Sequence, residues 1–235
     1  MKKILFFLAA MLMIPMVHAA PEFKEGVNYD VVKQTGSAQP EVMEFFSYYC
    51  PHCATFEPIV EQLKAGLPEG VPLKKNPVAF LGREMGPEMQ RAYAVASLLN
   101  AEAKLTPAIF TKIHTQRQPP MSRDDVKKIF VDNGVPAEEF DGAVDSFAVS
   151  GMVSQFDRNT ESYNIRGVPA EEFDGAVDSF AVSGMVSQFD RNMESYNIRG
   201  VPAFLVNGKY MIKIESISSQ EQFNQLVKFL LAKKD

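Results

Sequence analysis

The only two cysteines of the chain, Cys50 and Cys53, are separated by two residues in a Cys-Pro-His-Cys run. Two thiols at this spacing can close a small, reversible disulfide that exchanges with the cysteines of other proteins. A structural disulfide stabilises a fold more when it closes a longer loop, because it then constrains the unfolded chain more. The spacing therefore predicts redox chemistry and argues against a purely structural disulfide.

The position of Cys50 favours a thiolate. Pro51 is expected to begin a helix, which places Cys50 at the helix N-terminus. Unpaired backbone N–H groups and the helix dipole stabilise an anion there, and His52 can add a positive or hydrogen-bonding group. These effects lower the pKa of Cys50 and stabilise the reduced form, so that the disulfide form is a strong oxidant. Cys53, further into the helix, is expected to be the more buried thiol.

Half of a zinc site is the alternative interpretation of the cysteine pair. Apart from His18 in the N-terminal segment, His52 and His114 are the only histidines that could complete it. A tetrahedral zinc site needs two ligands besides the cysteine pair, and the sequence offers few candidates for them. We therefore expect no metal and no external cofactor, with the Cys50–Cys53 disulfide carrying the chemistry.

The N-terminal segment 1–19 has the pattern of a secretory signal peptide. Two lysines precede an apolar run, and a small-residue site predicts cleavage after Ala19. An uncleaved anchor is the alternative, but the run is short and Pro15 interrupts it. Export would place the cysteines in an oxidising compartment. Without the signal the chain carries 22 basic and 29 acidic residues, a net charge of −7 that gives no indication of nucleic-acid binding.

The order of predicted elements indicates an α/β fold with a helical insertion. The apolar run 41–49 predicts a buried central strand that ends at the cysteine motif. Further strands are expected over 27–33, 71–80, 203–206 and 209–214, and helices over 51–67, 87–100, 105–116, 122–133 and 218–231, with Ser122 and Ser218 as N-caps. This order predicts a thioredoxin-like domain over 20–82 and 200–235, interrupted by an α-helical domain over 83–199.

A tandem repeat enlarges the predicted insertion. Residues 134–166 and 167–199 are the same 33-residue segment and differ only at Thr160 and Met193. Recombination between flanking Gly-Val-Pro-Ala sequences would produce this pattern, whereas a solenoid would stack several diverged units. Each copy has apolar residues at helical spacing, but the fold offers one place for that face. We therefore expect one copy to dock and the other to loop out, where it could promote self-association of an otherwise monomeric protein.

Glu44 is the lone acid in the predicted central strand. Strand alternation places it on the same face as Phe46 and Tyr48, beneath the cysteine motif. A buried carboxylate there would have a raised pKa and could help to move a proton at Cys53. The alternative is a solvated charge at the edge of the sheet.

The run from Glu44 to Cys53, Glu-Phe-Phe-Ser-Tyr-Tyr-Cys-Pro-His-Cys, resembles the active site of the DsbA family of periplasmic thiol:disulfide oxidoreductases. Segments 67–71, 199–202 and 204–210 also fit this family. The resemblance implies that Val201 and Pro202 form a cis-proline loop that faces the disulfide and holds substrate backbone, where the alternative is an ordinary trans proline. It also implies that Lys75 is the partner of Glu44, where the alternative is again a solvated charge.

The function implied by the resemblance is oxidation of cysteine pairs in unfolded, newly exported proteins. A DsbB-like membrane quinone reductase would reoxidise the protein. A disulfide isomerase or reductase is the nearby alternative. A peptide-binding protein whose catalysis the duplication has impaired is an alternative from a different class.

Overall fold

The computed structural model describes residues 22–166 and 200–233. The predicted signal peptide over 1–19 and the second copy of the repeat over 167–199 lie outside the described residues. The expectation that one copy loops out therefore stays a prediction, as do the domain boundaries given above.

Five strands form one mixed sheet at the centre of the fold. They are β1 (Tyr29–Val31), β2 (Val42–Phe46), β3 (Leu73–Pro77), β4 (Ala203–Val206) and β5 (Tyr210–Ile212). The strand order is β1-β5-β4-β2-β3, in which β2 and β3 are parallel and the other pairs are antiparallel. The predicted central strand is therefore confirmed, because β2 is buried along its length between β4 and β3.

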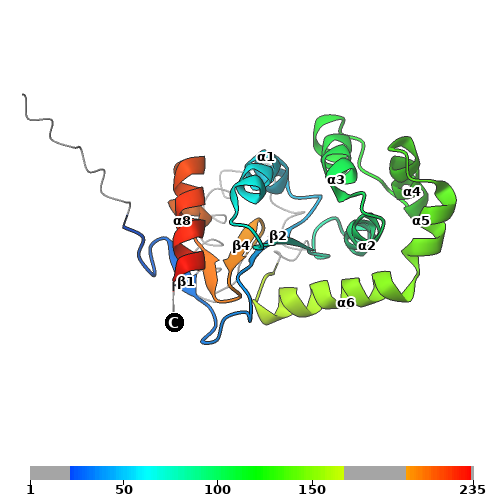
Figure 1. Cartoon of the computed structure of the whole chain (residues 1–235). Helices are drawn as coiled ribbons and strands as arrows, with labels where there is room; N and C mark the ends of the chain where they lie inside the picture. The colour runs from blue at the N-terminus through cyan, green and yellow to red at the C-terminus, as the bar shows by residue number, and fades with distance from the viewer. Residues whose placement is uncertain (1–21, 167–199, 234–235) are drawn as a thin grey trace, which may run out of the picture.

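The helices fall into two groups (Figure 1). Helices α1 (Pro51–Gly66) and α8 (Gln220–Ala232) lie beside the sheet. Between β3 and β4 the chain forms α2 (Met85–Leu98), α3 (Glu102–Phe110), a π-helical turn (Thr111–Thr115), α4 (Arg123–Asp132), α5 (Ala137–Val144) and α6 (Phe147–Ser162). Figure 1 shows α2 to α5 gathered at one end of the molecule, with α6 running back toward the sheet. Over residues 22–166 and 200–233, the predicted order of strands and helices is confirmed.

Alternation along β4 shows how the sheet separates two apolar layers. Phe204 and Val206 pack in a cluster with side chains of α1 and α8. Ala203 and Leu205 point the other way and pack with Ile165, which follows α6. Because successive side chains of a strand face opposite sides, the four-residue run Ala-Phe-Leu-Val serves both layers.

The copy of the repeat over 134–166 is docked on the helical core. Helices α5 and α6 bury Phe140, Val144, Val149 and Phe156 in the cluster that also holds α2 and α3 side chains. Phe147, at the start of α6, is 95% exposed. The apolar face predicted for this copy is therefore buried against α2.

One predicted helix cap is confirmed and one is wrong. Ser122 accepts a hydrogen bond from the Asp125 backbone N–H at the start of α4, as predicted. The last helix is capped by Ser219, which accepts from the Gln222 backbone N–H, and not by Ser218. Ser218 precedes the N-cap residue, and its backbone N–H donates a hydrogen bond to the side-chain oxygen of Gln222. The Gln222 side chain thus contacts the residue before the N-cap, and the capping motif begins one residue later than predicted.

No helix within 22–166 or 200–233 is long and apolar enough to cross a membrane.

Candidate redox site

Cys50 is the N-cap residue of α1, as predicted. Its extended backbone lets the Sγ atom accept a hydrogen bond from the Cys53 backbone N–H at 3.1 Å. A hydrogen bond from the Cys53 thiol is the largest cause of a lowered pKa at Cys50. The backbone N–H groups of Cys53 and His52 also lower this pKa, while partial burial opposes them. The first turn of α1 therefore stabilises a thiolate at Cys50.

Cys53 is fully buried, and its pKa is shifted in the opposite direction to that of Cys50. Burial raises its pKa far above the ordinary value of a thiol. The hydrogen bond to Cys50 and the negative charge there raise the pKa further. Both cysteines are free thiols in this structure, and Cys50 retains 4% exposure against none for Cys53. The two sulfurs are thus chemically distinct, and Cys50 is the one that a thiol from outside can reach.

The Val201–Pro202 peptide bond is cis, which confirms the predicted isomer. The Cys50 thiol donates a hydrogen bond to the Val201 carbonyl oxygen at 3.4 Å. The backbone just before Pro202 therefore lies against the reactive sulfur, although the two segments are far apart in the sequence.

Glu44 lies in a buried charge cluster with Lys75. Lys75 Nζ is 3.3 Å from Glu44 Oε2 and 2.6 Å from Glu57 Oε2. Burial raises the pKa of Glu44 from 4.5 to about 7, with the Lys75 charge opposing this rise. Burial also disfavours the Lys75 cation, but the two carboxylates outweigh this effect and raise its pKa. The alternative of solvated edge charges is wrong for both residues, because each side chain is less than one-tenth exposed.

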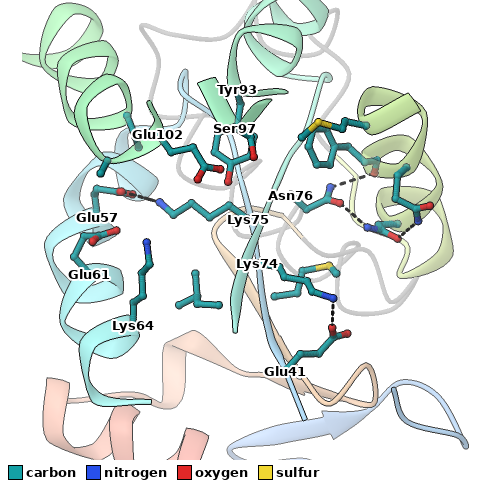
Figure 2. A pocket seen from close by; sticks show the side chains of 18 of the residues that line it. Glu41, Glu57, Glu61, Lys64, Lys74, Lys75, Asn76, Tyr93, Ser97 and Glu102 are labelled. Atoms are coloured by element: carbon teal, nitrogen blue, oxygen red, sulfur yellow. Dashed lines mark hydrogen bonds and ion pairs between the residues drawn. The ribbon is translucent and has the colours of Figure 1, made fainter. Parts of the chain in front are cut away.

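A cavity of about 620 Å³ lies along the edge strand β3 and reaches this cluster. Lys75 and Glu57 line it, as do the exposed residues Glu61 and Lys64. Figure 2 shows Lys75 extending across the cavity toward Glu57. The cavity thus connects Lys75 and Glu57 to the molecular surface, whereas Glu44 is fully buried.

His52 and Pro51 form the exposed side of the motif. The backbone N–H of His52 acts on Cys50, whereas its imidazole is exposed. His114, the other candidate ligand of the zinc alternative, is instead bonded to the Tyr48 carbonyl oxygen at 2.8 Å. Within the described ranges, no group of three or more His, Cys, Asp or Glu side chains is placed to hold a metal.

The sequence matches the model of one protein family, described as the DSBA-like thioredoxin domain, over residues 41–171 and 170–228. The chain belongs to the DSBA-like thioredoxin family. It is 35% identical over 243 residues to the thiol:disulfide interchange protein DsbA of Pectobacterium carotovorum, and the match covers all of both chains. It is 41% identical over 150 residues to the DsbA of Haemophilus influenzae, which covers 63% of this chain and 72% of the relative.

Solved structures of DsbA proteins share the fold. A DsbA variant from Proteus mirabilis, in complex with the non-covalently bound peptide PWATCDS, has a TM-score of 0.72 and 29% identity, covering 91% of this chain and all of that one. A DsbA from Klebsiella pneumoniae has a TM-score of 0.71 and 26% identity, with the same coverage. The resemblance to DsbA proteins expected from the sequence is confirmed.

The main residue of this DsbA-like site that the sequence reasoning missed is Glu57. It lies one helical turn after Cys53 on the buried face of α1 and is bonded to Lys75 through both carboxylate oxygens. A signal was present, because residues four apart share one face of a helix. An acid on the face that carries the buried cysteine was therefore a candidate partner for Lys75.

Proposed function

We propose that this chain is a periplasmic thiol:disulfide interchange protein that oxidises cysteine pairs in newly exported proteins. The observation that carries the proposal is the asymmetry of the cysteine pair. Cys50 has a lowered pKa at a helix N-terminus, while Cys53 has a raised pKa in the core. Stabilisation of the reduced form by the Cys50 thiolate makes the disulfide form oxidising. The names of the relatives support the same activity.

The first step is attack by a substrate thiolate on Cys50 Sγ of the disulfide. A mixed disulfide forms between substrate and Cys50, the Cys50–Cys53 bond breaks, and its electron pair passes to the Cys53 sulfur. Attack occurs at Cys50 because Cys53 is fully buried. The Cys53 thiolate then takes up a proton, which its raised pKa favours.

The second step releases the oxidised substrate. A second substrate thiolate attacks the substrate sulfur of the mixed disulfide, and Cys50 leaves as a thiolate. A thiol of low pKa is the better leaving group, so the hydrogen bond from the Cys53 N–H favours this direction. Two substrate thiols thereby become a disulfide, and the protein retains both electrons as a dithiol.

Glu44 is proposed to exchange the proton that Cys53 requires. Its pKa of about 7 allows both protonation states near neutral pH, and its charge acts on Cys53. Lys75 and Glu57, which line the cavity, would pass protons between this carboxyl and water.

Val201 and Pro202 are proposed to hold the substrate backbone beside Cys50. The support is the position of the Val201 carbonyl at 3.4 Å from the Cys50 sulfur. The peptide in the Proteus mirabilis complex supports peptide binding in this family. Substrates would then be recognised mainly through backbone groups, which suits a protein that acts on many unfolded chains.

Turnover requires a partner that accepts the two electrons. We infer a DsbB-like membrane quinone reductase for this role, and the predicted signal peptide is consistent with the periplasm. The redox disulfide is the only redox group that the proposed reaction needs. We expect a monomer, with any self-association depending on the extra copy of the repeat.

Substrate oxidation in vitro separates an oxidase from an isomerase or reductase. The oxidised protein is mixed with a reduced peptide that contains two cysteines, and the products are counted by alkylation and intact mass. An oxidase yields one peptide disulfide for each Cys50–Cys53 disulfide consumed, and Cys50→Ala yields none. Rearrangement of a scrambled substrate without net oxidation would instead indicate an isomerase. Peptide binding that is unaffected by Cys50→Ala, with no oxidation by the wild type, would indicate a non-catalytic binding protein.

A further inference from the structure

The turn that leads into Cys50 is held by the helical insertion. The Cys50 N–H donates to the Ser47 carbonyl at 3.1 Å, so Tyr48 and Tyr49 are the central residues of a tight turn between β2 and α1. The Tyr49 hydroxyl donates to the Pro120 carbonyl at 3.1 Å. This turn sets the direction from which the backbone reaches Cys50.

His114 makes the contact to the backbone of this turn. Its Nε2 atom lies 2.8 Å from the Tyr48 carbonyl oxygen. A carbonyl oxygen can only accept, so Nε2 carries the hydrogen and donates it.

A local irregularity directs His114 toward the turn. His114 lies in the π-helical turn Thr111–Thr115 that extends α3. Such wide turns change the direction of side chains relative to the preceding helix and are frequent at functional sites. The His114 ring also packs on Phe110, which in turn contacts the Tyr48 ring edge-on at 5.2 Å. The imidazole is therefore held in place and half-buried.

We propose that His114 is a positioning residue of the redox site: by fixing the Tyr48 carbonyl, it holds the Ser47–Cys50 turn so that Cys50 Sγ faces the N–H groups of the first turn of α1. The proposal rests on the proposed function, because it assigns to the helical insertion a share in setting the oxidising strength of the Cys50–Cys53 pair. The contact acts through backbone geometry and does not require His114 to touch the substrate.

Two amide side chains of different length test the role. In His114→Gln the amide nitrogen extends about as far as Nε2 and can donate to the Tyr48 carbonyl, whereas His114→Asn is one methylene too short. Lys112→Ala is the matched control, because Lys112 lies in the same π-helical turn but bonds the exposed Gln118 side chain. The pKa of Cys50 is measured from thiolate absorbance, and the equilibrium constant with glutathione from alkylation and intact mass.

We expect His114→Asn, but not His114→Gln or Lys112→Ala, to weaken the Cys50–Cys53 pair as an oxidant. His114→Asn should raise the Cys50 pKa and lower the equilibrium constant for oxidising glutathione by about three- to tenfold, the effect of losing one hydrogen bond. His114→Gln and Lys112→Ala should stay within about twofold of the wild type on the same scale. If His114→Asn changes only the urea midpoint and leaves both redox quantities unchanged, the role is merely structural and the proposal fails.

The tautomer of His114 can be measured in the wild type, so this test does not depend on whether a variant folds. Nitrogen NMR of the imidazole should show hydrogen on Nε2 of His114 in the neutral form, and a neutral Nδ1–H tautomer would overturn the proposal. Failure of the proposed function is distinguishable, because the wild type itself would then show an ordinary Cys50 pKa and no oxidation of glutathione.

Discussion

Asn76 Nδ2 donates a hydrogen bond to Thr160 Oγ1 at 3.1 Å, and Thr160 is the position at which the two copies of the repeat differ. Asn76 is buried in β3, and its amide also bonds the Phe156 carbonyl and the Asn159 side chain on α6. Figure 2 shows Asn76 directed at this helix, away from Lys75. Met193 would offer no comparable acceptor at this place. The copy over 134–166 is therefore the better match for β3.

Deletion of residues 167–199 should leave a folded and redox-active protein. The deletion joins Arg166 to Gly200 and restores the Ile-Arg-Gly-Val-Pro sequence that now leads into Pro202 from Ile198. Ile165 and Val201 already pack in the same apolar cluster, so the join brings together segments that share one side of the sheet. We expect the glutathione equilibrium constant to change by less than about threefold, since no described contact of Cys50 is removed. Loss of folding or of redox activity would show that the second copy is required.

Two deletions give a matched test of the Thr160 contact. Removal of 134–166 or of 167–199 produces chains that differ at one residue only, methionine or threonine at the place of Thr160. The threonine chain should be more stable by about 0.5–1.5 kcal/mol, because it keeps the hydrogen bond from Asn76. Urea unfolding measures the difference. A serine at this position should restore most of it, and equal stability of all three chains would show that the hydroxyl does not contribute.

Glu44→Gln should make the reduced protein more stable at alkaline pH. The Glu44 pKa is 4.5 unfolded and about 7 folded, so at low pH the carboxyl is protonated in both states and carries no penalty. As pH rises from about 4.5 to 7 the unfolded chain ionises first, and the wild type loses stability. The advantage of the variant should grow over this range to about 1–3 kcal/mol, allowing for the lost Lys75 contact. Urea midpoints at pH 4 and pH 8 check this, and a pH-independent difference would contradict the raised pKa.

Cys53→Ala should trap substrates that Cys50→Ala does not. With Cys53 removed, the Cys50 thiolate attacks a disulfide of the substrate, a mixed disulfide forms and one substrate sulfur leaves as a thiolate. Cys53 is then absent and cannot attack Cys50 Sγ to release the substrate, so the mixed disulfide persists longer than in the wild type. Fully buried Cys53 should form no such complex when Cys50 is removed. Non-reducing electrophoresis after incubation with an unfolded protein that contains a disulfide shows the difference. Equal trapping by both variants would mean that the two thiols are equally accessible.

The parts of the site that are local in sequence were predictable. Helix N-terminal placement of Cys50 follows from Pro51, and burial of Glu44 follows from the apolar strand around it. The lowered pKa of Cys50 and the deeper burial of Cys53 follow from their positions in the same helix. The placement of Pro202 near Cys50 and of Lys75 beside Glu44 needed the family resemblance, because no local pattern places β4 or β3 beside the motif.

Contacts that depend on tertiary placement were missed. His114 was considered only as a zinc ligand, because the π-helical turn that directs it at Tyr48 leaves no clear mark in the spacing of apolar residues. Glu57 was overlooked although its helical position gave a signal. The pairing of Asn76 with Thr160 joins residues 84 positions apart, which only the packing of α6 on β3 determines.

The equilibrium constant between the Cys50–Cys53 pair and glutathione tests the central claim most directly. It is obtained in defined glutathione buffers, with alkylation and intact mass reporting the fraction oxidised, because the chain has no tryptophan to serve as a fluorescent probe. A stabilised Cys50 thiolate predicts a pair that oxidises glutathione strongly, more so than an unfolded Cys-Pro-His-Cys peptide. A pair that is as reducing as the peptide, or more so, would contradict the proposed oxidase.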